Sequence, residues 1–455
     1  MGAYSLTMKT PRLILLLATA LLGGLSLGGK EASAPIRLTI DVDRAVLPAN
    51  STEKAIVKIG LDCLRLPDRR QRPPVNLALV IDRSGSMEGA KIAKAREAAR
   101  ELVRRLASDD IVALIAYDSN AEVLVPATRV GDGRMLEAAI GRIEANGGTA
   151  LHSGVSRGAE EVRRYLGETR NVPRVILLSD GQANVGPSSP DELGRLGASL
   201  LKEGIPVTTI GLGLGFNEDL MTRLALRSDG NTYFVESSDD LPRIFAAELG
   251  DALNVVARRV VLEIEFPEGV RPLQFVGRDG MVRGRKAELM LNQLYGGQEK
   301  FALIEVEVEP AAARTEREIA RARLAYEDAL TNSPGSATAA RKVSFSADAK
   351  VVVASADHRV QADFAANSLA LAKDEAIRLA DAGRREEAAA VMRQRALDMK
   401  SMSAIFNNSA VSSMAAPAEA EADRLEREGL SNAQRKAYRT DSANIRNQQA
   451  VSNGR

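Results

Sequence analysis

The chain has few of the side chains on which many protein functions depend. Its 455 residues include one cysteine, two histidines and no tryptophan, and aromatic residues make up 4%. A single cysteine excludes an intrachain disulfide, and so few cysteines and histidines exclude a His/Cys zinc cluster. The shortage of aromatic residues argues against surfaces that stack nucleic-acid bases. Because 61 Lys and Arg balance 60 Asp and Glu, we expect no nucleic-acid partner.

The first 34 residues have the pattern of a secretory signal peptide. Lys9 and Arg12 precede an apolar run from Leu13 to Gly29, and Ala32-Ser33-Ala34 provides a small-residue cleavage site. The run is short for a membrane-spanning helix, which needs about 20 residues. We therefore predict a secreted or periplasmic, cell-envelope protein, which meets the membrane only if this segment is kept as an uncleaved anchor.

The middle of the chain contains a strand that ends in oxygen-bearing side chains. Residues 75–81 are mostly apolar, which is typical of a central parallel strand buried on both faces, and Asp82 follows them. Ser84 and Ser86 come next in the loop. Because ligands bind where the carboxyl ends of such strands meet loops, these three residues are candidate ligands. Oxygen is the ligand atom that a hard divalent cation such as Mg²⁺ prefers.

Two later segments complete the candidate site. Gly147-Gly148-Thr149 lies between two predicted helices, so the Thr149 hydroxyl can stand on a loop at the sheet edge. Residues 175–179 form a second buried strand, and Asp180 follows it. The motif D-x-S-x-S, the Gly-Gly-Thr loop and the strand ending in Ser-Asp-Gly together resemble the metal-ion-dependent adhesion site of the von Willebrand factor A family.

The resemblance covers about residues 73–254 and implies a role for each candidate. Ser84, Ser86 and Thr149 would coordinate Mg²⁺, or Mn²⁺ or Ca²⁺, directly. Asp82 and Asp180 would hold the waters of the ion or alternate with them as ligands. Three neutral hydroxyls leave a divalent ion poorly neutralised, so an open coordination position would attract the carboxylate of an Asp or Glu on a protein partner.

Such a site is compatible with three functions. We predict a metal-dependent protein-binding module that acts in adhesion or in the assembly of an envelope complex. The alternative is a structural or scaffolding protein in which the metal only stabilises the loops. A metal-dependent hydrolase is the third possibility, but none of the five candidate oxygens is placed as a general base, and the sequence has no convincing Ser-His-Asp set. We therefore predict that the protein is not an enzyme.

The pattern of strands and helices divides the chain into regions. Between residues 73 and 254 strands alternate with helices, which predicts a doubly wound, mostly parallel α/β sheet of the Rossmann-like kind. Strands without helices occupy residues 35–72 and 255–356, and we expect them to close a β-sandwich into which the α/β domain is inserted. Residues 357–455 are predicted to form a helical hairpin and a flexible helical tail.

Some elements leave room for more than one interpretation. Glu318–Glu327 has a composition that favours a helix but alternates like a strand, and we predict a strand paired with Arg341–Ser346 across a turn at residues 332–335. In the tail, helices are expected at Ala418–Gly429 and Asn432–Arg446. Cys63 lies on the apolar face of an alternating segment, which predicts a buried and unreactive thiol.

Overall fold

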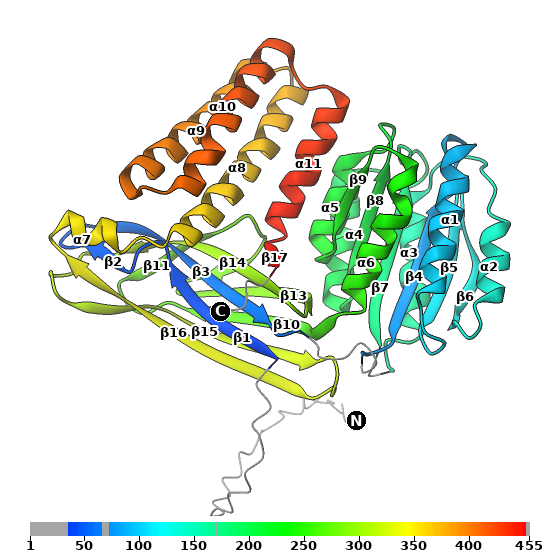
Figure 1. Ribbon diagram of the computed structural model, residues 1–455, viewed down its shortest axis with the longest axis horizontal. Helices are drawn as coiled ribbons and strands as arrows, with labels where there is room; N and C mark the ends of the chain where they lie inside the picture. Colours follow the sequence, from blue (N-terminus) through cyan, green and yellow to red (C-terminus); the bar gives the residue numbers. More distant parts are fainter. Residues whose placement is uncertain (1–34, 66–71, 169–170, 452–455) are drawn as a thin grey trace, which may run out of the picture. The chain divides into compact units, whose positions relative to one another are not determined.

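Figure 1 shows the computed structural model of the chain, which describes residues 35–65, 72–168 and 171–451. The predicted signal peptide, residues 1–34, lies outside the described residues.

A six-stranded sheet forms the centre of the α/β region. Its order is β6-β5-β4-β7-β8-β9, and neighbouring strands are parallel except β5 and β6. The strands are β4 (Val75–Asp82), β5 (Ile111–Tyr117), β6 (Ala121–Arg129), β7 (Val172–Ser179), β8 (Val207–Leu212) and β9 (Thr232–Val235). Every residue of β4, β5 and β7 is buried, as expected for strands covered on both faces.

Helices cover both faces of this sheet, so the predicted doubly wound fold is confirmed. Apolar residues of α1, α2 and α6 pack on one face, and those of α3, α4 and α5 pack on the other. The helices are α1 (Ala90–Arg104), α2 (Arg134–Gly141), α3 (Leu151–Arg163), α4 (Pro190–Glu203), α5 (Glu218–Ser228) and α6 (Leu241–Ala252), with short 3-10 turns η2 (Gly85–Met87) and η3 (Ser238–Asp240).

Two largely antiparallel sheets share a second hydrophobic core. One has the order β1-β3-β14-β11 with β17 also paired to β14, and the other has the order β12-β13-β10-β15-β16-β2. Strands from before and after the α/β region meet in this core, as expected for an interrupted sandwich. The strands are β1 (Ile36–Val42), β2 (Val46–Pro48), β3 (Glu53–Cys63), β10 (Val255–Glu265), β11 (Val270–Val276), β12 (Met281–Arg283), β13 (Lys286–Tyr295), β14 (Gln298–Val308), β15 (Glu316–Asp328), β16 (Pro334–Ser346) and β17 (Gln449–Val451).

The C-terminal region is helical, as predicted, and its helices pack together (Figure 1). It contains α7 (Ala349–Ala354), α8 (His358–Asp381), α9 (Arg385–Phe406), α10 (Ser409–Glu428) and α11 (Asn432–Arg446). Helix α10 differs from the expectation, because it begins nine residues before Ala418 and continues through Pro417. Among the residues that the structure describes, no helix combines the length and apolar character needed to cross a bilayer.

Two strands, β6 and β16, contain a proline that the sheet tolerates. Strand β6 runs through Pro126 to Arg129. Because β6 is an edge strand, the missing N–H of Pro126 does not interrupt the sheet. Strand β16 begins at Pro334, inside the expected turn, since a first strand position also tolerates proline.

Candidate metal site

Two of the five candidate ligands leave the sheet from adjacent strands. Strand β4 ends at Asp82 and pairs in parallel with β7, so that Ile81 lies opposite Leu178. Asp180 follows the last residue of β7. Because parallel strands end at the same edge of the sheet, the two aspartates emerge next to each other.

Hydrogen bonds connect four of the candidates into one network. Asp82 Oδ1 accepts a hydrogen bond from the Ser84 backbone N–H at 2.8 Å, and the Ser84 and Ser86 hydroxyl oxygens lie 3.1 Å apart. The Ser86 hydroxyl donates to Asp180 Oδ1 at 2.6 Å. Asp82, Ser84 and Asp180 are at most 2% exposed, whereas Ser86 is exposed. The network is therefore open to solvent on the Ser86 side.

The loop that carries Thr149 is fixed to the D-x-S-x-S turn by backbone contacts. The N–H of Gly85 donates to the carbonyl of Gly147 at 3.1 Å. Gly147 has a φ of 73°, a backbone conformation that glycine adopts without steric cost. The Thr149 N–H donates to Asn184 Oδ1 at 2.8 Å, so the loop that follows β7 also holds Thr149 in place.

The three hydroxyls meet beside Gly181. A Cβ atom added to this glycine would lie 3.2 Å from Thr149 Oγ1, 3.3 Å from Ser86 Oγ and 3.8 Å from Ser84 Oγ. The structure thus brings all three hydroxyl oxygens around one point, next to the aspartate that precedes Gly181. The absence of a side chain at Gly181 leaves room at that point.

Several contacts around the aspartates come from residues that the sequence patterns did not single out. Asp82 Oδ2 accepts hydrogen bonds from the Ser179 hydroxyl at 2.6 Å and the Tyr117 hydroxyl at 3.3 Å. Both donors are the last residues of buried strands, so their positions at this sheet edge could have been inferred from strand ends. Lys91 was not recognisable in this way. Its ammonium pairs with Asp180 Oδ2 and donates to the Ser86 carbonyl at 3.2 Å.

The electrostatics of the site favour a bound cation. Burial raises the pKa of the Asp82 carboxyl above its usual value, and hydrogen bonds from Ser179 and Ser84 act in the opposite direction. The neighbouring Asp180 raises the pKa of Asp82 further. Two adjacent buried carboxylates are stabilised in their charged forms when a positive charge lies between or beside them.

The donor set fits a hard divalent cation. It consists of hydroxyl and carboxylate oxygens only, which are suited to Mg²⁺, Mn²⁺ or Ca²⁺. Within the described ranges, no three His, Cys, Asp or Glu side chains gather as a group that could hold a metal ion. His152 makes its contact within α3, where its Nδ1 lies 3.5 Å from the Ser156 hydroxyl.

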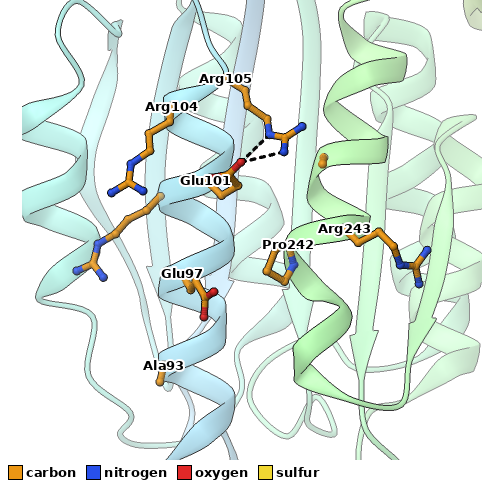
Figure 2. A pocket seen from close by; sticks show the side chains of 9 residues that line it. Ala93, Glu97, Glu101, Arg104, Arg105, Pro242 and Arg243 are labelled. Carbon is orange, nitrogen blue, oxygen red and sulfur yellow. Dashed lines mark hydrogen bonds and ion pairs between the residues drawn. The ribbon is translucent and has the colours of Figure 1, made fainter.

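A cavity of about 720 Å³ lies between α1 and α6, away from these ligands (Figure 2). Arg104, Arg105 and Arg243 line it together with Glu97 and Glu101. Arg105 pairs with Glu101 at 2.8 Å, and both side chains are exposed. None of the five candidate ligands lines this cavity, so it is separate from the candidate metal site.

The α/β region of the chain matches a known protein family. The family model described as von Willebrand factor type A domain matches residues 76–247, which include all five candidate ligands. The matched residues form a von Willebrand factor type A (VWA) domain. This VWA domain consists of the six-stranded sheet and the helices that cover it.

The likeness to a solved structure extends beyond the VWA domain. A von Willebrand factor type A protein from Catenulispora acidiphila covers 88% of this chain and 97% of its own, with a TM-score of 0.66. At 17% sequence identity this likeness shows the fold alone.

Two curated relatives each match about half of this chain. An uncharacterised protein from Synechocystis sp. is 30% identical over 247 residues, which cover 52% of this chain and 58% of that protein. The uncharacterised protein YfbK from Escherichia coli is 25% identical over 239 residues, which cover 52% of this chain and 41% of that protein. The chain therefore spans about half the length of these relatives.

Proposed function

We propose that the VWA domain is a divalent-metal-dependent protein-binding module. In this proposal Asp82, Ser84, Ser86, Thr149 and Asp180 hold Mg²⁺, or Mn²⁺ or Ca²⁺, and an Asp or Glu of a protein partner completes the coordination. Domains of this family generally mediate interactions between proteins and bind a divalent metal at this kind of site. The observation that carries the proposal is the convergence of three hydroxyl oxygens beside Gly181.

The burial of the ligands explains why the partner should supply a carboxylate. Three neutral hydroxyls would neutralise none of the charge of the ion, and Mg²⁺ requires near-octahedral oxygen coordination. Asp82 and Asp180 are enclosed by the protein, whereas Ser86 is exposed. An external oxygen ligand would therefore approach from the Ser86 side, and a negatively charged one would bind best.

The surface next to Asp180 offers room for the rest of the partner. Gln182, two residues after Asp180, lines a cavity of about 480 Å³ between the VWA domain and the C-terminal helices. Leu214 and Arg385 also line this cavity, and Leu214 is 49% exposed. The exposed leucine and the guanidinium in this cavity suit a protein segment that carries an apolar residue as well as an acidic one.

We also propose that this module works outside the cytoplasm, which the signal-peptide pattern at the N-terminus supports. Adhesion and the assembly of an envelope complex are the processes that such a location and such chemistry favour. We propose no catalytic role for the site, because its hydroxyl and carboxylate oxygens are arranged to hold an ion.

The first experiment measures Mn²⁺ binding to the full chain by titration calorimetry. We expect one ion per chain. Thr149→Ala and Ser86→Ala should each weaken Mn²⁺ binding by at least ~10- to 100-fold, which is the loss produced by removing even a residue that only hydrogen-bonds to a metal ligand. Ser153→Ala removes an exposed hydroxyl from the same helix that follows Thr149 and is the matched control. Unchanged binding in both ligand variants would contradict the proposed site.

A second experiment separates the binding module from the scaffold. The full chain is immobilised and panned against a random peptide display library in Mg²⁺, and again in EDTA. The binding module predicts enrichment of Asp- or Glu-containing peptides in Mg²⁺ only, and no enrichment by folded Thr149→Ala protein. The scaffold alternative predicts that the folded chain still captures peptides in EDTA and that the folded Thr149→Ala variant does so too. It also predicts a lower melting temperature for this variant.

A further inference from the structure

Lys91 is the charged side chain that contacts the candidate site without belonging to its ligand set. It lies in the first turn of α1, and its ammonium pairs with Asp180 Oδ2 and donates to the Ser86 carbonyl at 3.2 Å. Two of the five candidate ligands are thus in contact with a positive charge that the chain itself provides. The Lys91 side chain is 37% exposed.

Both oxygens of Asp180 have partners inside this cluster. Oδ1 accepts from the Ser86 hydroxyl at 2.6 Å, and Oδ2 pairs with Lys91. A divalent ion that uses Asp180, directly or through a water, must share this carboxylate with the ammonium group or displace it. In either case the unit positive charge of Lys91 lies close to the two positive charges of the ion, and their repulsion weakens binding.

We propose that Lys91 is a built-in competitor for the divalent ion and sets the affinity of the site for it. This inference rests on the proposed metal-dependent function and specifies how the same site is regulated. An incoming partner carboxylate offers the ammonium a second anion on the solvent side. The site therefore binds the ion weakly by itself and more tightly when an acidic partner is present. Binding of the ion and binding of the partner become coupled.

Lys94 provides a matched control on the same helix. It lies one turn further along α1 and is 34% exposed, which is close to the exposure of Lys91. Its ammonium pairs with Glu97 at 3.0 Å and Asp239 at 3.2 Å, and neither residue belongs to the candidate site. Removing the charge of Lys94 therefore changes the net charge of the chain by the same amount without freeing Asp180.

The experiment compares Mn²⁺ affinity in the full chain for the wild type, Lys91→Met, Lys91→Gln, Lys91→Arg and Lys94→Met. Both neutral variants of Lys91 are expected to bind Mn²⁺ about tenfold more tightly, because a unit charge in contact distance of the ligands acts even through water. Lys91→Arg and Lys94→Met should stay within about threefold of the wild type. The gain should shrink between about 0.02 M and about 0.5 M salt, as screening requires.

The possible outcomes distinguish this inference from the proposed function. If the wild type binds Mn²⁺ and the folded neutral Lys91 variants bind it equally well or more weakly, Lys91 is not a competitor and the inference is overturned. If neither the wild type nor the variants take up Mn²⁺ while circular dichroism shows native folding, the proposed function fails and the inference fails with it. A similar gain in Lys94→Met would also overturn it, since net charge would then explain the effect.

Discussion

A buried arginine, Arg174, joins the VWA domain to the sandwich, and its removal should reduce stability sharply. Arg174 of β7 pairs with Glu248 of α6, and both side chains are 0% exposed. The Arg174 guanidinium also donates to Gln293 Oε1 at 2.6 Å and to the Tyr295 hydroxyl, both on β13. One side chain thus connects the central sheet, the last helix of the VWA domain and the sandwich.

We predict that Arg174→Met lowers the free energy of unfolding by about 3–5 kcal/mol, because the Glu248 carboxylate is left buried without its counter-charge. Glu248 keeps hydrogen bonds from Asn231 Nδ2 at 2.9 Å and the Tyr233 hydroxyl at 3.2 Å, but these donors are neutral. In the double variant Arg174→Met with Glu248→Gln the buried charge is gone and an acceptor oxygen remains. We expect the double variant to recover at least about 2 kcal/mol of the loss.

The assay is urea unfolding of the full chain, followed by far-ultraviolet circular dichroism and by tyrosine fluorescence. Arg157→Met is the control, because the Arg157–Glu160 pair at 2.6 Å has both side chains about half exposed and should contribute less than about 1 kcal/mol. A loss below about 1 kcal/mol for Arg174→Met, with an unchanged dependence on urea, would refute the reasoning. So would a double variant no more stable than the single one.

Two further predictions concern the candidate site and the lone cysteine. Gly181→Ala keeps every candidate ligand but adds a Cβ close to Thr149 Oγ1 and Ser86 Oγ, so calorimetry should show about tenfold weaker Mn²⁺ binding; unchanged affinity would mean that these hydroxyls do not share an ion. Burial raises the pKa of Cys63 to about 12 from a usual 9.0, so the native thiol should resist a disulfide reagent at about pH 8 and react after unfolding. Between pH 9 and 12 the folded thiol keeps its proton while the unfolded thiol ionises. The contribution of Cys63 to the free energy of unfolding is therefore complete below pH 9 and declines between pH 9 and 12. Rapid labelling of the thiol in folded protein would contradict the prediction.

Periodic burial made much of the fold predictable from the sequence. The alternation in residues 318–327 predicted a strand against its helical composition, and β15 confirms it, with Ala322 and Leu324 buried and Arg321 and Arg323 exposed. Strand ends indicated the sheet edge at which Asp82 and Asp180 meet. The contributions of Lys91 and Asn184 could not be predicted, because they depend on side chains that reach across loops and leave no periodic signal in the sequence.

The C-terminal tail shows a second limit of sequence patterns. Helix α10 buries Ala415, Ala418 and Ala422, and alanine on a buried face differs little in hydropathy from the polar residues around it. Pro417 lies inside α10, although proline usually interrupts a helix. Here packing of α10 against α9 and α8 stabilises a helix that continues through the proline.

Helix α11 attaches to the VWA domain by charge rather than by an apolar face. Arg435 and Arg439 pair with Asp219 at 2.6 and 2.7 Å, and Lys436 donates to the carbonyl of Phe216 at 2.6 Å. Phe216 and Asp219 border the start of α5, and a Cβ added to the nearby Gly215 would lie 2.7 Å from the Asp180 carbonyl. The loop held by α11 is thus in contact with a residue of the candidate metal site. The C-terminal helices thus hold the loop that contacts Asp180, although none of the five candidate ligands comes from them.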